Sequence, residues 1–164
     1  MMSGENKLQT AKEKLANFIK TIEEYSENTG VFKQEIIVDF ETVNGIDLAV
    51  MESISQQDCF NYAYILYDYA IHIQCELSRQ KVAFNWCENA LNQTMTMIKD
   101  DYEPDFWKFT KHEMKAPTIA KDNSYVAAIL SFKQVAEARI QTLSGLDVLT
   151  RKKAECLIEK GKRI

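Results

Sequence analysis

Residues 59–98 read CFNYAYILYDYAIHIQCELSRQKVAFNWCENALNQTMTMI, and this stretch decides the fold class. It contains neither Gly nor Pro, the two residues that most disfavour the interior of a helix. Alternating steps of four and three residues along it meet twelve side chains, of which ten are apolar or Cys. Such a seam is typical of a long helix that packs against another long helix. The twelve positions are Cys59, Ala63, Leu66, Ala70, Ile73, Leu77, Gln80, Phe84, Cys87, Leu91, Thr94 and Ile98.

A helix over residues 55–98 is expected to be about 65 Å long, at about 1.5 Å per residue, so it needs a second long helix from the same chain or from another one. Residues 122–124 offer helix caps, and a second apolar stripe follows them to about Gly161. The chain is therefore predicted to be mainly α, with residues 52–164 forming a long antiparallel helical hairpin with coiled-coil-like packing. The second stripe consists of Val126, Ile129, Phe132, Ala136, Ile140 and Leu143, continued more loosely by Leu146, Leu149, Leu157 and Ile158.

Residues 1–51 are predicted to form an accessory or oligomerisation arm. An apolar face at helical spacing predicts an amphipathic helix over residues 6–25. Residues 35–40 and 46–50 alternate like strands, and a three-residue loop between them pairs Phe40 with Leu48 in a small β-hairpin. The spacing of the apolar residues in the first of these segments also fits a helix, so this alternative stays open.

Composition narrows the class of protein. The chain has 164 residues, 46% hydrophobic and 27% charged, which fits a folded domain rather than a disordered tail. It has no apolar run of membrane-spanning length and no secretory signal at its start, and its four cysteines form no CxxC pair. Phosphate-loop, nucleophile-elbow and zinc-protease motifs are also absent from the sequence. We therefore expect a cytoplasmic, non-enzymatic chain with no cofactor, no metal and no membrane contact.

Charge is distributed unevenly along the sequence. Residues 1–110 carry 9 Lys or Arg and 18 Asp or Glu, whereas residues 111–164 carry 11 and 6. The basic C-terminal part indicates a face or an end that binds an anionic partner. Two alternatives are a contact between acidic and basic ends of neighbouring subunits and a basic helix that is simply solvated.

The connector at residues 100–121 interleaves aromatic and cationic side chains. Phe106, Trp107 and Phe109 precede lysines at positions 111 and 115. This pattern can lie along a nucleic-acid backbone, with aromatic rings stacking on bases. The competing interpretation is a hydrophobic loop that clamps the ends of the long helices.

Four tyrosines stand within residues 62–69, next to a second apolar surface formed by Phe60, Tyr64, Tyr67 and Ile71. Tyrosine rings can stack on bases, but they are also enriched at subunit interfaces. The neighbouring carboxylates of Asp58 and Asp68 repel phosphates, so they favour the interface.

Residues 52–161 resemble the UvsY-type recombination mediators of tailed phages. The long Tyr-rich helix leads into the element RQKVAF at Arg79–Phe84. A variable acidic loop then precedes KHEMK at Lys111–Lys115 and AKD at Ala120–Asp122. A second long helix ends in leucine-spaced, Arg-containing sequence and EKG at Glu159–Gly161.

The resemblance implies a small helical protein that forms a ring-like homo-oligomer. Such a protein binds single-stranded DNA, displaces single-strand binding protein from it and helps to load a RecA-like recombinase. The expected nucleic-acid contacts are Arg79, Lys81, Trp86, Trp107, Lys108, Lys111, Lys115 and Lys121. The expected subunit contacts are Tyr62, Leu66, Tyr69, Ile73, Leu77 and Phe84.

One departure from the family's pattern concerns the segment after the Lys-Val-Ala element, where the family carries basic residues. Here those places are Asn85 and Cys87, on either side of Trp86. Either DNA contact has moved to Lys111, Lys115 and Lys121, or the chain does not bind DNA strongly. Two other functions therefore stay open: a helical phage-assembly or adaptor subunit without DNA binding, and a small acidic inhibitor of a host protein that acts through residues 1–110.

Overall fold

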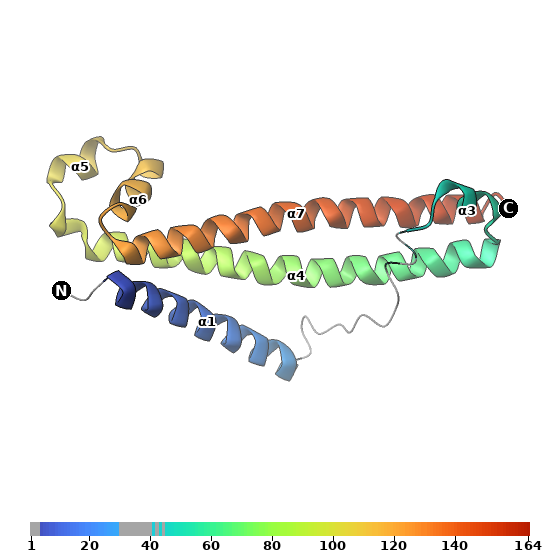
Figure 1. Ribbon diagram of the computed structural model, residues 1–164, viewed down its shortest axis with the longest axis horizontal. Helices are drawn as coiled ribbons and strands as arrows, with labels where there is room; N and C mark the ends of the chain where they lie inside the picture. Colours follow the sequence, from blue (N-terminus) through green and yellow to red (C-terminus); the bar gives the residue numbers. More distant parts are fainter. Residues whose placement is uncertain (1–3, 30–40, 42, 44) are drawn as a thin grey trace. The chain divides into compact units, whose positions relative to one another are not determined.

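The computed structural model describes residues 4–29, 41, 43 and 45–164 (Figure 1). These residues form helices and connecting turns without a strand, so the predicted mainly α class is confirmed. None of the helices in the described ranges is long and apolar enough to cross a membrane. The elements are α1 (Gly4–Thr29), α3 (Leu48–Ser53), α4 (Gln56–Met97), the short 3-10 turn η1 (Lys99–Asp101), α5 (Pro104–Phe109), α6 (His112–Ala120) and α7 (Ser124–Gly161).

The chain divides into two compact units, and each unit contains one section of both long helices. Unit 1 consists of Met1–Val31 and Arg79–Arg139, and unit 2 consists of Phe32–Ser78 and Ile140–Ile164. The arm expected at residues 1–51 is therefore shared between the units, since α1 belongs to unit 1 and α3 to unit 2.

In unit 2, α4 and α7 pack antiparallel along the predicted seam (Figure 1). The side-chain amide of Gln56 donates a hydrogen bond to the carbonyl of Gly161 over 2.8 Å. About five turns further along α4 and about four turns back along α7, Gln74 Nε2 donates to Asp147 Oδ2 over 2.7 Å. The seam residues of α4 that are buried in this unit are Cys59, Ala63, Leu66, Ala70, Ile73 and Leu77.

In unit 1, α1 joins the pair of long helices. Ala11 is fully buried in the same cluster as Cys87 of α4 and Ile129 of α7. On the pair itself, Lys133 Nζ of α7 forms an ion pair with Glu88 of α4 at 2.8 Å. The amphipathic helix, the two long helices and their antiparallel packing were thus correctly predicted, with α1 a few residues longer at each end.

The predicted β-hairpin is not formed where it can be examined. Its second strand, at residues 46–50, is wrong because Leu48–Ser53 is helical. Asp47 is the N-cap of this helix, and its Oδ1 accepts a hydrogen bond from the backbone N–H of Val50 over 2.9 Å. A cap of this kind satisfies an N–H group that otherwise lacks a helical partner, so it favours a helix over a lone strand. The first strand, at residues 35–40, lies outside the described residues.

The seam of α7 also departs from its predicted course beyond Leu143. Asp147 and Thr150 are buried, whereas Leu149, expected in the stripe, is 61% exposed. Steps of four and three residues from Leu143 land on those two polar positions, so helical geometry overrides the hydrophobic pattern here. Burial of the Asp147 carboxylate is compatible with folding because Gln74 and Arg151 both donate hydrogen bonds to it.

Two glycines of α7 are expected to respond in opposite ways to alanine. A Cβ at Gly161 would lie 3.1 Å from Cys59 Cβ and 3.3 Å from Phe60 Cζ, whereas nothing lies within 4 Å of one at Gly145. Gly161→Ala should therefore lower the free energy of unfolding by about 1 to 2 kcal/mol through overpacking. Gly145→Ala, inside the helix, should raise it by about 0.5 to 1 kcal/mol. Urea denaturation of both variants checks this, and a stabilising Gly161→Ala would contradict the close approach of α4 and α7 at that end.

Candidate nucleic-acid interface

The eight residues predicted to contact nucleic acid all belong to unit 1. They fall into two groups. Three stand on α4 and five stand on the connector between the long helices. The α4 group is Arg79, Lys81 and Trp86, and the connector group is Trp107, Lys108, Lys111, Lys115 and Lys121.

The α4 group does not form an exposed cationic patch. Trp86 is half-buried and its ring stacks on Phe18 of α1, with centroids 5.7 Å apart and planes at 26°. Arg79 is also half-buried and lines a small cavity with Phe18 and Ile22 of α1. Lys81 is exposed. Trp86 and Arg79 therefore serve to pack α1 against α4, and Lys81 alone of this group presents its charge to solvent.

Trp107 is a packing residue of the connector. Its indole Nε1 donates a hydrogen bond to the carbonyl of Lys99 over 2.8 Å. The rings of Phe106 and Tyr102 meet it edge-on, with centroids 5.3 Å and 6.3 Å away. Lys115 Nζ lies 5.5 Å from the centre of the indole, within cation–π range. For Trp107, the alternative of a hydrophobic clamp describes the structure better than a free stacking surface.

Phe109 and Met114 are the large apolar side chains of the connector that face solvent, and neither is among the residues predicted to contact nucleic acid. Phe109 is 72% exposed and Met114 is 52% exposed. Lys108 Nζ lies 5.2 Å from the centre of the Phe109 ring. Phe106, Trp107 and Phe109 are equivalent in the sequence, so no local signal distinguishes the exposed ring from the two that pack.

Four lysines of the connector stand in α6, at its two ends or shortly before it. Lys111 occupies the N-cap position of this helix and Lys121 its C-cap position, and both are exposed. Lys115 stands one turn after Lys111, and Lys108 precedes the helix. We name Lys108, Lys111, Lys115, Lys121 and the exposed Phe109 the α6 cluster.

Four of the five acidic side chains of the connector come earlier in the chain, at positions 100, 101, 103 and 105, and the fifth, Glu113, stands in the first turn of α6. The pKa of the Tyr102 phenol is raised, mainly by burial and to a smaller extent by the negative charges of Asp122 and Asp101. These carboxylates therefore make the surroundings of Tyr102 unfavourable for phosphate. The connector thus begins with an acidic stretch, and lysines outnumber the single carboxylate of Glu113 in the part that follows. These lysines can contact phosphates while Phe109 offers a ring to a base.

Three of the six residues predicted to join subunits are instead buried inside the chain itself, and the other three are half-buried. Leu66 and Ile73 are each 1% exposed and Leu77 is buried, so these three belong to the chain's own seam. Tyr62, Tyr69 and Phe84 are half-buried, and Lys133 Nζ lies 5.0 Å from the centre of the Phe84 ring. Phe60, Tyr64 and Ile71 of α4 are exposed, and Tyr67 between them is half-buried; we name these four residues the outer stripe of α4.

In the described part of the chain, the thiols and metal-ligating groups form neither an activated nucleophile nor a metal site. All four cysteines carry free thiols. Burial raises the pKa of the Cys87 thiol to about 11 against the opposing influence of Lys133, so this thiol is protonated and a poor nucleophile at neutral pH. Among the described residues, no three His, Cys, Asp or Glu side chains are placed to hold a metal ion.

No protein-family model, curated protein or solved structure matches this chain. The resemblance to the UvsY-type mediators consequently depends on the sequence elements within residues 52–161. The helical hairpin predicted from the apolar pattern is present, whereas the resemblance, DNA binding and partners stay predictions.

Proposed function

We propose that this chain is a non-enzymatic recombination mediator that binds single-stranded DNA through the α6 cluster. In this proposal it assembles into a homo-oligomer and helps to load a RecA-like recombinase by displacing single-strand binding protein. The observation that carries the proposal is that lysines stand at both ends of α6 and within it, while the exposed ring of Phe109, with Lys108 Nζ 5.2 Å from its centre, precedes the helix. The resemblance of residues 52–161 to the mediator family supplies the biological context.

The chemistry of the α6 cluster suits a single strand better than a duplex. Lysines at positions 108, 111, 115 and 121 neutralise phosphates and release condensed counterions, which drives binding without reading sequence. An exposed phenyl ring stacks on any base, and a base is available for stacking only when the strand is unpaired. One cluster has few contacts, so strong binding requires several subunits on one strand.

Assembly is proposed to use the outer stripe of α4. Tyr64 is 71% exposed and Ile71 is 48% exposed, and both follow the same alternation of three and four residues as Phe60 and Tyr67. A helix face of this spacing suits packing against a helix of another subunit. The seam residues Leu66 and Ile73 are then left to hold each subunit together.

The proposal is tested by fluorescence anisotropy of labelled oligothymidine with the full chain. Four lysine–phosphate contacts predict a loss of affinity of roughly 50-fold between about 50 and about 200 mM salt. Double-stranded DNA of the same length serves as the control and should bind more weakly, because its bases cannot stack on Phe109. Absence of binding at the lower salt concentration, or binding that does not depend on salt, would contradict the proposal.

The outer stripe also favours a second candidate function, a helical assembly or adaptor subunit that does not bind DNA. The chain carries a net charge of −4, which suits protein contacts better than a polyanion. Light scattering at the same protein concentration distinguishes the two functions, since an ordered oligomer without affinity for oligothymidine supports the adaptor.

A further inference from the structure

Unit 1 contains an open groove between α1, the C-terminal part of α4 and the start of α7. It has a volume of about 680 Å³, which accommodates a ligand of the size of a nucleoside. Two aromatic rings line it, those of Trp86 and Tyr125, together with the side chains of Lys14, Ala90 and Met97. We call it the α1 groove.

The two rings of the α1 groove are held in place by the chain itself. The indole of Trp86 stacks on Phe18 with ring centroids 5.7 Å apart, and Lys14 Nζ lies 5.5 Å from the centre of the Tyr125 ring. Trp86 and Tyr125 are half-buried, so each also presents part of its ring to the groove. Unpaired bases bind to proteins largely by stacking on aromatic rings, and rings that are already positioned lower the cost of binding.

The polar side chains of the α1 groove match the edge of a base. Asn89 and Gln93 stand one turn apart on α4, and both are exposed and line the groove. A carboxamide carries a donor and an acceptor side by side, and its most frequent two-point pairing with a base is to adenine. Stacking on a ring combined with hydrogen bonds along an edge is how proteins recognise the bases of single strands.

The charges around the α1 groove favour the base of a strand over its phosphates. Lys14 is the charged residue among the described side chains that line it, and its ammonium group already lies over Tyr125. Glu13 precedes Lys14, and Asp122 precedes Tyr125 by three residues, so carboxylates accompany this cation in the sequence. Phosphates are therefore left to the α6 cluster, whose Lys121 stands four residues before Tyr125 within the same unit.

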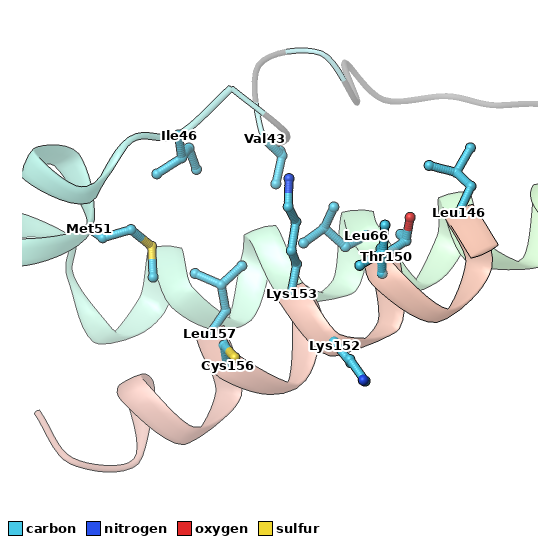
Figure 2. Close-up of a pocket in the computed structure, with 11 residues that line it drawn as sticks. Val43, Ile46, Met51, Leu66, Leu146, Thr150, Lys152, Lys153, Cys156 and Leu157 are labelled. Carbon is cyan, nitrogen blue, oxygen red and sulfur yellow. The ribbon is translucent and has the colours of Figure 1, made fainter.

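The pocket of unit 2 has a different lining (Figure 2). Its side chains are mainly aliphatic, and Figure 2 shows Lys153 extending beside Leu66 toward Val43. Among the described residues that line this pocket there is no aromatic ring on which a base could stack. The α1 groove is therefore the better candidate for a base.

We propose that the α1 groove holds an unpaired adenine of the single strand that binds at the α6 cluster. The base stacks on Tyr125 beside the indole of Trp86, and the carboxamides of Asn89 and Gln93 pair with its edge. The part of this inference that concerns the strand rests on the proposed function, whereas the affinity of the groove for the base does not. Lysine–phosphate contacts alone are indifferent to sequence, so the groove gives the chain a preference for strands that contain adenine.

The first test uses Trp86 as a reporter in a Trp107→Phe background, where it is the single tryptophan of the chain. Deoxyadenosine monophosphate should quench its fluorescence. Thymidine monophosphate should bind at least about fivefold more weakly, because its base stacks less and lacks the amino group that pairs with a carboxamide. Deoxyribose phosphate, which has no base, should leave the fluorescence unchanged.

The carboxamides are tested by Asn89→Ala with Gln93→Ala, two exposed positions whose replacement should leave the fold intact. This variant should bind deoxyadenosine monophosphate at least about fivefold more weakly and lose the preference over thymidine monophosphate. The matched control, Asn85→Ala with Asn92→Ala, removes two exposed carboxamides of α4 outside the lining and should change the affinity less than about twofold. Tyr125→Leu should weaken binding at least about fivefold, and Tyr125→Phe, which keeps the ring, should not.

Strands of defined sequence separate this inference from the proposed function. A strand of alternating adenine and cytosine should bind at least about threefold more tightly than one of alternating thymine and cytosine. The Asn89→Ala, Gln93→Ala variant should lose this difference and keep the salt dependence of binding. Charge reversal at Lys111, Lys115 and Lys121 should instead remove strand binding and leave the quenching of Trp86 by deoxyadenosine monophosphate intact.

Three results would overturn the inference. They are a Trp86 fluorescence that deoxyadenosine monophosphate does not quench, equal quenching by deoxyribose phosphate, and an equal loss of affinity in the groove variant and its matched control. Quenching by the free nucleotide without a preference among strands would overturn the part that concerns the strand, and would assign the α1 groove to a free nucleotide.

Discussion

Replacing both Leu66 and Ile73 by aspartate is expected to unfold the chain. Each side chain is 1% exposed in the seam between α4 and α7, so each aspartate would bury an unpaired charge and remove apolar contacts. The combined loss should exceed about 5 kcal/mol, which is comparable with the whole stability of a domain of this size. Circular dichroism should show a loss of most of the helical signal at 25 °C, and purification should yield aggregated or unfolded protein.

The matched control places the same substitutions on the outer stripe of the same helix. Tyr64→Asp with Ile71→Asp changes side chains that are 71% and 48% exposed, so the helical signal and the urea midpoint should stay close to those of the parent chain. Loss of the oligomer in this control would assign assembly to the outer stripe. A soluble, fully helical Leu66→Asp, Ile73→Asp variant would mean that the seam faces another direction.

The seam of α4 was predictable because its signal is repeated and uninterrupted. Gly and Pro are absent from the whole helix, and an apolar residue recurs at nearly every step of three or four. Eight of the twelve predicted seam positions are buried, and the remaining four are half-buried. A pattern that extends over so many turns outweighs the local preferences of single residues.

The second half of α7 was less predictable because its buried face is partly polar. The buried Asp147 carboxylate accepts hydrogen bonds from Arg151, on the same helix, and from Gln74, which is 73 residues away in the sequence. The hydrophobic pattern instead favoured Leu149, which faces solvent. The strand expected at residues 46–50 failed for a related reason, since a single cap at Asp47 decides between two weak local preferences.

In the candidate site, too, the sequence predicted the types of residue but not which of their side chains are exposed. The lysines of the α6 cluster were identified from the interleaving of charge and aromatic residues. Which ring is accessible depends on distant partners, because Phe18 covers Trp86 and the Lys99 carbonyl holds Trp107. Among the described residues, the ring contacts of Phe109 include Lys108 alone. The exposure of Phe109 could not be inferred from its neighbours in the sequence.

Charge reversal at Lys111, Lys115 and Lys121 is expected to abolish binding to single-stranded DNA while leaving the oligomer intact. Three lost phosphate contacts at about 1 kcal/mol each lower the affinity at least about 100-fold at low salt. Any residual binding should depend less on salt, because the slope of affinity against salt falls with each phosphate contact removed. Anisotropy of labelled oligothymidine measures both effects, and light scattering checks that the molar mass is unchanged.

The control for this variant reverses three exposed lysines of α1, at positions 12, 14 and 20, which alters the net charge by the same amount within unit 1. Its affinity should fall much less if phosphates contact α6, because screening weakens charges that lie farther from the strand. Phe109→Ala separates stacking from charge: it should weaken binding by about 1 to 3 kcal/mol while leaving the salt slope unchanged. Unchanged affinity in the α6 variant would refute the α6 cluster as the site, and would move the search to Lys81 on α4, the exposed cation among the other predicted contacts.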